Sequence, residues 1–594
     1  MPLARPLVAV VGAGPVGSLA ALELARHGLG VIVLEARDEI SWTSRAICIS
    51  RRSLEILDRA GVGETFTRKG LPWSRGKTFH RDRLVFRLEM PHSREDAHAP
   101  FINLQQCHTE QFLIEAIRSM ENGPELRFGH HVTAVGPGAT GVRLHVRSDQ
   151  GESTVEADWV VAADGARSIV RSNLGLRMRG TSYEGRFLIS DIQVEGASWP
   201  VERHVWFDAP ANPGSTVILH VQPDGIWRID MQLHEDEDPE LALRDEMLLP
   251  RLQAQLDMIG VAAPWRLVWK SVYRAHSLSL ESYRQGRVLF AGDAAHLVPI
   301  FGVRGLNSGF DDAHNLAWKL AMVARGQAPD ALLDSYSAER RRATDENIAN
   351  AEKSTWFMSP PSAGFRCMRD AALLLAHEHE WARRLINPRQ SSFHVYDGSP
   401  VIVGDGSPVA GIQPGAPVPN LPFRGTHLQR ALSPLGFSAF VFGHSLGPGQ
   451  MSQTLGFCDK LGIEAITIDQ EERRAAETFA SDVFPVYLIR PDEHVAARFA
   501  ANEIHQLPDA FAVATGRAGK TILAKGDLRV SSEIEDIYEA LCTAVDRARI
   551  AGDETALERI ALTLANEIGD AVRVRNLIDK ALDAGAAGTR ERER

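Results

Sequence analysis

Residues 287–320, RVLFAGDAAHLVPIFGVRGLNSGFDDAHNLAWKL, decide how the fold of this chain is interpreted. The stretch begins with a short apolar run, residues 288–291, which is typical of a buried strand. Gly292 and Asp293 end this predicted strand. A carboxylate at a strand end can accept hydrogen bonds from ligand hydroxyls, and a glycine lets a ligand approach the backbone closely.

The loop after this strand leads into a predicted helix. Pro299, Gly302 and Gly305 favour unusual backbone angles in the loop. We expect Asn307 or Ser308 to cap the helix, because a short polar side chain can accept hydrogen bonds from the first N–H groups. The apolar residues at helical spacing are Ala313, Leu316, Ala317, Leu320, Ala321 and Ala324. The free N–H groups and positive dipole end of such a helix favour an anionic ligand.

The composition indicates a folded chain of several domains. The chain has 594 residues, of which 44% are hydrophobic and 24% charged, and single cores rarely grow beyond roughly 250–300 residues. Lys and Arg number 65 against 76 Asp and Glu, a net charge of −11. This balance disfavours a general surface for nucleic acid or anionic membranes, so we expect neither as a partner.

The cysteines and the apolar runs indicate a cytoplasmic protein. The five cysteines form no C-x-x-C pair, and their odd number argues against a disulfide framework. No uninterrupted apolar run reaches transmembrane length. The first 25 residues have one Arg before an apolar region, but cleavage as a signal peptide would destroy the glycine motif described next. We expect no bound metal.

A G-x-G-x-x-G motif stands near the start of the chain, at Gly12, Gly14 and Gly17. It follows an apolar strand, begins a helix, and precedes a second strand that ends at Glu35. This context is typical of dinucleotide binding. Gly12 would make the turn, Gly14 would admit the pyrophosphate, Gly17 would let helix and strand pack, and Glu35 would bind the adenosine ribose. The alternative is a glycine-rich turn that binds nothing.

Other polar residues follow predicted strands or precede helices. Arg45 is a candidate contact for the dinucleotide phosphates, and a surface Arg is the alternative. Gln106 lies near a helix start, with Thr109 or His108 near the N-cap, and would face the cofactor or solvent. A buried strand over residues 159–163 leads into Asp164, Gly165 and Arg167. We interpret this second turn as a contact on the phosphate side of the dinucleotide, one that can also face a nicotinamide cofactor.

Residues 181–279 have the alternating pattern of an antiparallel sheet. The strands are predicted over 187–194, 205–207, 215–221 and 227–233. Such a sheet, inserted between the second turn and residue 287, could cover a substrate site. Its Trp206, His220, Trp227 and Arg228 are more often core or surface residues, so we assign none of them a catalytic role.

The C-terminal third predicts a linker, a small domain and a helical tail. Helices continue to about residue 385, and residues 386–422 are rich in Pro and Gly, as in a linker. Residues 423–528 predict a small α/β domain in which Phe484-Pro485 is typical of a thioredoxin-like fold. Without a C-x-x-C pair we expect no redox role there. In 529–594, Ser532 and Glu535 predict a capping box before two or three helices, and the last residues, TRERER, are predicted to be disordered.

The glycine motif, Asp164-Gly165 and Gly292-Asp293 together resemble the three motifs of the single-component (class A) flavin-dependent aromatic hydroxylases. The branch that the chain resembles is that of the phenol and 3-(3-hydroxyphenyl)propionate hydroxylases. The resemblance covers roughly residues 5–510. It implies an α/β fold with a Rossmann-like FAD-binding domain (1–180 and 280–385), an inserted antiparallel-sheet substrate domain (181–279), a linker (386–422), a thioredoxin-like domain without redox cysteines (423–528) and a short helical tail (529–594).

The resemblance also implies roles for single residues. It assigns to FAD the residues Gly12, Gly14, Gly17 and Glu35 (ADP half), Arg45 and Gln106 (pyrophosphate and ribityl–flavin edge), Asp164 and Arg167 (FAD and NAD(P)H), Asp293 (ribityl chain), and Gly305, Leu306 and Asn307 (pyrimidine side). The family loop usually has the form P-P-x-x-G-Q-G-M-N, whereas here Ile300 replaces a proline, Val303 a glycine and Arg304 a glutamine. We expect flavin binding to survive. Pro299 and Arg304 are candidates in the flavin loop, and the catalytic residues stay unknown.

The activity implied is that of an FAD-dependent monooxygenase. It would hydroxylate a phenolic substrate in the catabolism of aromatic compounds, using O2 and NADH or NADPH through a flavin C4a-hydroperoxide. A small phenolic acid is our candidate substrate, and a homodimer is left open. The alternatives are epoxidation, Baeyer–Villiger oxygenation, or a non-catalytic flavin-bound sensor or binding protein. Halogenation is disfavoured, because Trp265-Arg-Leu-Val-Trp269 lacks the spacing of W-x-W-x-I-P.

Overall fold

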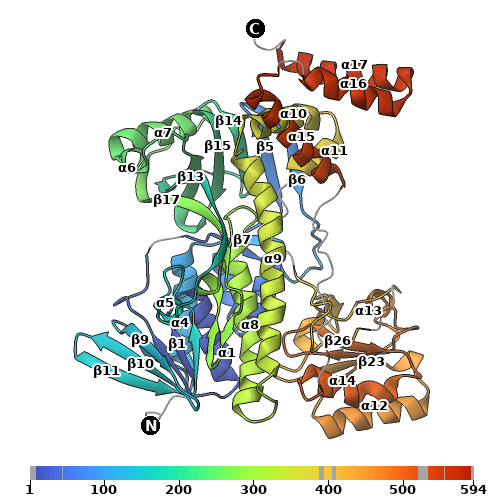
Figure 1. Cartoon of the computed structure of the whole chain (residues 1–594). Helices are drawn as coiled ribbons and strands as arrows, with labels where there is room; N and C mark the ends of the chain where they lie inside the picture. Colours follow the sequence, from blue (N-terminus) through green and yellow to red (C-terminus); the bar gives the residue numbers. More distant parts are fainter. Residues whose placement is uncertain are drawn as a thin grey trace.

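The computed structural model describes residues 8–42, 45–196, 198–386, 393–404, 410–518, 533–553 and 556–589. Ser532 of the predicted capping box and residues 590–594 of the predicted disordered end lie outside these ranges. Figure 1 shows a nucleotide-binding part, a large sheet above it, a small domain beside it, and the helical tail next to the large sheet.

The nucleotide-binding part is built on a six-stranded sheet. Its order is β18 (Arg284–Gln285), β19 (Val288–Phe290), β12 (Trp159–Ala162), β1 (Val8–Val11), β2 (Val31–Leu34) and β8 (Glu125–Arg127). All neighbours except β18 and β19 pair in parallel. The central strands are continuous apolar runs, and every residue of β1 and β12 is buried.

The three predicted turns follow adjacent parallel strands. β19, β12 and β1 are neighbours in the sheet, so their carboxyl ends meet at one edge. α1 (Pro15–Arg26) begins at the first turn and packs against α8 (Gly305–Ala324), the helix that follows the third. The topology thus brings together segments that are far apart in the sequence.

The large sheet has eight strands. In order they are β20 (His296–Leu297), β17 (Trp265–Ser279), β13 (Arg179–Val194), β16 (Ile226–Gln232), β15 (Asn212–Val221), β14 (Arg203–Ala209), β5 (Arg75–His80) and β6 (Arg83–Glu89). The four predicted strands correspond to β13–β16. Strands β5, β6 and β20 come from outside residues 181–279, and β14 pairs with β5 in parallel.

Each face of the large sheet packs on different elements. Leu188, Leu219 and Ile229 lie on the outer face, in a cluster with residues of α7 (Asp245–Met258). Phe187 and Phe207 lie on the opposite, inner face, in a cluster that includes Phe301 of the loop before α8. The inner face therefore covers the flavin loop predicted from the sequence.

Smaller elements complete this half of the molecule. They are α2 (Arg51–Arg59), α3 (Gly63–Lys69), α4 (Gln106–Ser119), α5 (Ile169–Asn173), α6 (Pro239–Ala242), the sheet β3-β7-β4 (Cys48–Ser50, Phe101–Asn103, Leu71–Trp73) and the sheet β11-β10-β9 (Gly151–Ala157, Val142–Ser148, His131–Pro137). Helix α9 (Leu332–Met358) runs from the nucleotide-binding part to the large sheet (Figure 1). Helices α10 (Ala363–Ala376) and α11 (Glu380–Ile386) follow it.

The segment predicted as a linker is partly buried. In its described residues, 393–404 and 410–422, the chain is mostly irregular. Tyr396 and Ile402 are nevertheless only 3% and 4% exposed, and the Tyr396 hydroxyl accepts a hydrogen bond from Arg340 of α9. This segment therefore packs between α9 and the small C-terminal domain, where Tyr396 stacks on His494.

The small C-terminal domain contains a four-stranded sheet. Its order is β24 (Glu464–Ile468), β23 (Ser438–Phe442), β25 (Val486–Ile489) and β26 (Val495–Phe499), and only β23 and β24 are parallel. Helices α12 (Pro448–Leu461), α13 (Arg473–Thr478) and α14 (Leu507–Ala514) give the order β-α-β-α-β-β-α, which is the arrangement of a thioredoxin-like fold. The tail forms α15 (Glu533–Ile550), α16 (Ala556–Ile568) and α17 (Ala571–Thr589), of which α15 packs on α10.

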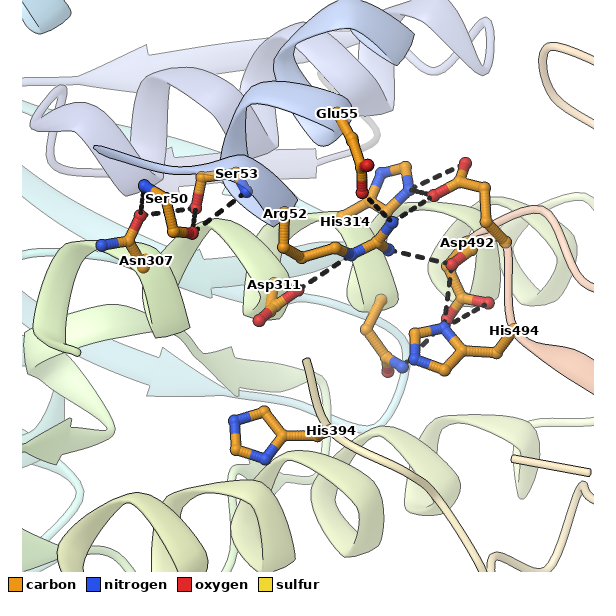
Figure 2. Close-up of polar contacts among 12 residues, drawn as sticks. Ser50, Arg52, Ser53, Glu55, Asn307, Asp311, His314, His394, Asp492 and His494 are labelled. Atoms are coloured by element: carbon orange, nitrogen blue, oxygen red, sulfur yellow. Dashed lines mark hydrogen bonds and ion pairs between the residues drawn. The ribbon is translucent and has the colours of Figure 1, made fainter. Parts of the chain in front are cut away.

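A cluster of buried charges joins this domain to the nucleotide-binding part. Glu493, in the turn between β25 and β26, accepts a hydrogen bond from Arg52 of α2 at 3.0 Å. Its carboxylate also lies 2.9 Å from Nε of Arg59 and 3.0 Å from Nε2 of His314. Arg52, His314 and Asp492 of this region meet in Figure 2. These cations outweigh burial and hold the pKa of Glu493 below its usual range.

Replacing Glu493 by Gln should destabilise the whole protein. The substitution leaves three cationic side chains without their shared carboxylate, and breaking a buried ion pair costs about 3–5 kcal/mol. Denaturant unfolding followed by circular dichroism measures the loss. Gln in place of Glu471, an exposed carboxylate of the same domain, is the control and should change little. Equal stability of the two variants would contradict the role given to Glu493.

Candidate functional site

The first turn, between β1 and α1, has the close packing that its glycines predict. Gly12 has a φ of +99°, and a Cβ there would lie 2.5 Å from the Ala163 carbonyl oxygen. A Cβ on Gly17 would lie 2.0 Å from the Gly12 carbonyl oxygen, whereas one on Gly14 would meet nothing within 4 Å. Gly12 and Gly17 thus serve packing, and Gly14 leaves room in front of the helix N-terminus, where a phosphate binds.

Glu35 lies at the end of β2 and closes one side of this turn. It is 7% exposed, and its Oε2 accepts a hydrogen bond from the Ala13 N–H at 2.7 Å. Its Oε1 accepts from Nε and the backbone N–H of Arg37, both at 2.9 Å. Burial raises the pKa of Glu35, but these hydrogen bonds outweigh burial and lower it. The ionised carboxylate keeps acceptor capacity for ribose hydroxyls.

The second turn follows β12 and leaves one carboxylate oxygen unsatisfied. Oδ2 of Asp164 accepts from the Val170 N–H at 3.1 Å. Oδ1 is buried and has no hydrogen-bond partner among the described residues, and burial raises the pKa of this carboxyl group. Such an atom suits a ligand donor. Arg167, predicted beside it, is exposed.

The third turn follows β19 and is fixed from below by α8. Gly292 has a φ of +58°, and its N–H donates to Oδ2 of Asp312 at 2.9 Å. The same oxygen lies 2.7 Å from Nε2 of His296, and Oδ1 accepts from Nε of Arg340 at 2.7 Å. Burial would raise the pKa of Asp312, but His296 and Arg340 lower it to about 2. The carboxylate is therefore a permanent anchor for this turn.

Asp293 is exposed between buried neighbours in this third turn. Gly292 and Ala294 are buried, whereas the Asp293 side chain reaches solvent. The surrounding protein nevertheless raises the pKa of Asp293, against the opposing charges of His296, Arg45 and Arg171. The carboxylate thus lies in a recess. Arg45, which is itself exposed, lies near enough to act on it.

Arg171 connects the second and third turns. Its NH1 donates to the Ala294 carbonyl at 3.1 Å, and its NH2 donates to the Ala166 carbonyl at 2.6 Å. Asp164 and Asp293 both act electrostatically on its guanidinium. Because Gly12 of the first turn also packs on Ala163 at the second, the three turns converge. We assigned Arg171 no role from the sequence, where only its distance of seven residues from Asp164 hinted at one.

The loop before α8 differs from the sequence prediction in two places. The helix begins at Gly305 with Arg304 as its N-cap, so neither Asn307 nor Ser308 caps it. Asn307 instead accepts from the Ser50 N–H at 2.9 Å and the Ser53 hydroxyl at 2.7 Å, as Figure 2 shows, and donates to the Cys48 carbonyl. Its side chain is thus occupied in holding β3 and α2 against the loop.

Two departures from the family loop have structural consequences. Val303 has a φ of +60°, which is unfavourable for a β-branched residue and explains why a glycine is usual there. Arg304 is 2% exposed and donates to Oδ1 of Asn347 in α9 at 2.8 Å. Its guanidinium is directed into the protein, so its position does not favour a direct catalytic role. Pro299 is buried in the same loop.

Gln106 is the first residue of α4, Gln105 is the N-cap, and His108 and Thr109 follow in the first turn. Oε1 of Gln106 accepts from the Ala46 N–H at 3.1 Å and its Nε2 donates to Glu110 at 2.9 Å. Gln106 thereby holds the backbone next to Arg45. Leu306 and Gly305 form the first turn of α8, and a Cβ on Gly305 would meet nothing within 4 Å.

These features fit FAD. Gly14 and Gly305 leave room beside two helix N-termini, Glu35 and Asp293 present carboxylates, and Asp164 has an unsatisfied buried oxygen. The spacing of the turns along one sheet edge suits an extended dinucleotide. Above the loop, Phe301 contacts Phe187 of the large sheet, with ring centroids 5.1 Å apart. An apolar ceiling of this kind suits an aromatic ligand.

Comparison with known proteins agrees with this geometry. Residues 6–351 match the family model described as the FAD binding domain. The chain belongs to the class A flavin-dependent aromatic hydroxylases. Its cofactor is FAD, and it is a monooxygenase.

Relatives of this hydroxylase act on different substrates. It is 31% identical to the 12-dehydrotetracycline 5-monooxygenase/anhydrotetracycline 6-monooxygenase of Streptomyces rimosus subsp. rimosus, over 82% of this chain and 94% of the relative. It is also 31% identical to the 3-(3-hydroxy-phenyl)propionate/3-hydroxycinnamic acid hydroxylase of Mycolicibacterium smegmatis, over 61% of this chain and 63% of that protein. The flavin-dependent monooxygenase PieE, solved with FAD and substrate, has the same fold: the TM-score is 0.72 at 22% identity, over 87% of this chain and 100% of PieE.

The described part of this hydroxylase has neither a metal-binding cluster nor a membrane-spanning helix. No group of three or more His, Cys, Asp and Glu residues there could hold a metal ion. None of its described helices has the length and apolar character needed to cross a membrane.

Exchanging Gly14 for Ala should weaken FAD binding without unfolding the protein. The added Cβ meets no protein atom within 4 Å, so the free energy of unfolding of the flavin-free protein should change by less than about 1 kcal/mol. The same carbon would occupy the space through which the pyrophosphate approaches. Flavin absorbance of the purified variant, compared with that of wild type, measures the loss.

The matched change is Gly17→Ala, whose Cβ would lie 2.0 Å from a backbone oxygen. This variant should lose stability as well as flavin. Retention of a full complement of FAD by the Gly14 variant would show that the first turn does not hold the pyrophosphate.

Proposed function

We propose that this enzyme hydroxylates a phenolic aromatic substrate, using O2 and either NADH or NADPH. The observation that carries the proposal is the convergence of the three turns beneath the inner face of the large sheet. Arg171 joins two of the turns. The loop before α8 lies between the turns and the sheet, and its Phe301 packs on Phe187. This arrangement supports a flat cofactor on one side of the loop and a flat substrate on the other.

The residues of the chain have distinct parts in this proposal. Gly12 and Gly17 shape the first turn, and FAD is bound by Gly14, Glu35, Arg45, Asp164, Asp293, Gly305, Leu306 and the backbone of Asn307, with Gln106 holding the Arg45 segment. Arg167, exposed at the second turn, is free to meet the nicotinamide cofactor. When bound, FAD supplies the chemistry, which is reduction by NAD(P)H and activation of O2.

The protein's own contribution is positioning and exclusion of water. The N-terminus of α8 directs N–H groups toward the flavin site, where negative charge develops on reduction. The cluster around Phe301 keeps the space between loop and sheet apolar, which protects a reactive oxygen species from water. A cytoplasmic location and assembly as a homodimer are further parts of this proposal.

Epoxidation and Baeyer–Villiger oxygenation remain alternatives on the same scaffold. Product identification distinguishes them from hydroxylation, because only hydroxylation adds a phenolic group and leaves the ring bonds unchanged.

A panel of phenols tests the proposed function. The purified protein should be yellow and should oxidise NADH or NADPH severalfold faster in the presence of 3-(3-hydroxyphenyl)propionate, the acid named for one relative. 3-Phenylpropionate, which lacks the hydroxyl group, is the matched control and should stimulate oxidation less. If no phenol in a broad panel raises the oxidation rate with either nucleotide, the protein is not a phenol hydroxylase.

A further inference from the structure

The inner face of the large sheet carries a row of polar side chains that are not among the residues assigned to FAD. The register places His220 of β15 opposite Arg228 of β16, and Arg228 opposite Asp191 of β13. Arg203 of β14 lies next to His204, which pairs with Leu219 of β15, and its charge acts on His220. All four side chains are buried. Polar groups at such depth need partners, because their transfer from water is costly.

Two members of the row satisfy each other. Nε and NH2 of Arg228 donate to Oδ1 and Oδ2 of Asp191 at 2.7 and 2.8 Å. This bidentate pair neutralises both charges and leaves neither for a ligand.

Arg203 is different, because it is a buried cation without an anion. It is 8% exposed, and it makes neither a side-chain hydrogen bond nor an ion pair with any described residue. Burial lowers the pKa of its guanidinium to about 10, so the group is still charged at neutral pH. A buried charge is costly unless it is paired. No described residue supplies the missing anion, so Arg203 is suited to bind an anionic ligand.

Asp230 lies two residues after Arg228 and points to the same face of the sheet. It is 8% exposed, and its buried Oδ1 has no hydrogen-bond partner among the described residues. Burial raises the pKa of Asp230 to about 7, with Arg228 lowering it and Asp191 raising it further. Its carboxyl group can therefore change protonation state near neutral pH.

His220 lies between Arg203 and Arg228 and does not supply a charge. Burial, together with Arg203 and Arg228, lowers the pKa of His220 to about 3, so its imidazole is neutral. Its buried Nδ1 has no hydrogen-bond partner in the described part of the chain. His220 is thus a further polar group available to a ligand.

The row faces the flavin loop. The charges of Arg228, Arg203 and Asp230 act on the thiol of Cys48 in β3, so this thiol lies close to the row. The Cys48 backbone carbonyl accepts from Asn307 of α8 at 3.2 Å, and Val303 of the loop packs in the same small cluster as Cys48. The row is thus next to the segment on which the flavin ring would rest.

We propose that this row recognises an aromatic acid, with Arg203 binding the carboxylate of the substrate and Asp230 accepting the proton of its phenol. The proposal rests on the proposed function and names its substrate class. One strand separates β14 from β16, so the two residues stand on the order of 10 Å apart across the sheet. This span suits a phenol that carries a carboxylate on its ring or on a short chain.

The proton transfer activates the ring. The phenolic O–H bond breaks, the proton moves to a carboxylate oxygen of Asp230, and the electron pair stays on the phenolic oxygen. The resulting phenolate pushes electron density to the ring carbons that receive oxygen. Asp230 must be ionised to act, so catalysis should increase as pH rises through about 7.

The first experiment compares 3-(3-hydroxyphenyl)propionate with its primary amide as substrates. Arg203→Gln should raise KM for the acid at least about tenfold, the range for a hydrogen bond to a charged group, and leave KM for the amide unchanged. Arg203→Lys keeps the charge and should recover part of the loss. Arg266→Gln, an exposed change on β17, is the control. FAD content and melting temperature establish that each variant is folded.

The second experiment measures the pH profile of Asp230→Asn with the acid. In the wild type, kcat/KM should rise with pH through about 7, and the variant should lose this rise together with most of its kcat. If Asp230→Asn changes KM but leaves kcat and the pH profile unaltered, Asp230 is not the proton acceptor.

The inference is overturned if Arg203→Gln affects acid and amide equally, or if Asp230→Asn keeps both its turnover and its pH profile. If neither compound stimulates NADH or NADPH oxidation by the wild type, the broad panel of phenols tests the proposed function separately. Binding then decides the anion site: the acid should perturb the flavin spectrum of the wild type, and Arg203→Gln should raise the Kd of the acid but not that of the amide. Equal Kd values for the acid in both proteins would reject it.

Discussion

The carboxylate of Asp312 is the group on which the flavin site depends. It is fully buried, and it accepts the Gly292 N–H at 2.9 Å and a hydrogen bond from Arg340 at 2.7 Å. It thereby joins the end of β19 to α8 and α9. Asp293 is the next residue after Gly292. By holding the Gly292 N–H, the buried carboxylate of Asp312 therefore also sets the position of the Asp293 carboxylate, which faces the ligand. The left-handed turn at Gly292 is held in the same way.

The same network extends from the flavin loop to the C-terminal domain. Arg340 also donates to the Ser308 carbonyl and the Tyr396 hydroxyl. The preceding residue of α9, Glu339, accepts from Arg490, the residue after β25, at 2.6 Å. Buried ion pairs lose much of their energy to desolvation, so their main effect is to select one arrangement of the parts. The small C-terminal domain thus has a structural use here: its buried charges hold α8 and α9 in place.

Local patterns predicted what depends on local physics. The glycine turns, their strands and the helices at their carboxyl side were all visible, because strand and turn preferences are encoded within about ten residues. The start of α8 was not, since Asn307 bonds to Ser50 and Cys48, more than 250 residues away. Likewise, the sequence alone does not bring Arg203 and Asp230 together, because only the strand register places both on one buried face of the sheet. The segment around Tyr396 has the composition of a linker, yet Arg340 gives its hydroxyl a buried partner.

The central claim is that this fold transfers one oxygen atom from O2 to an aromatic ring held between the flavin loop and the large sheet. The most direct measurement is turnover with a stimulating phenol under 18O2, followed by mass spectrometry of the product. The account predicts a hydroxylated ring carrying one 18O atom, formed in proportion to the NAD(P)H consumed. Recovery of all reducing equivalents as hydrogen peroxide, with no labelled product from any stimulating phenol, would contradict it.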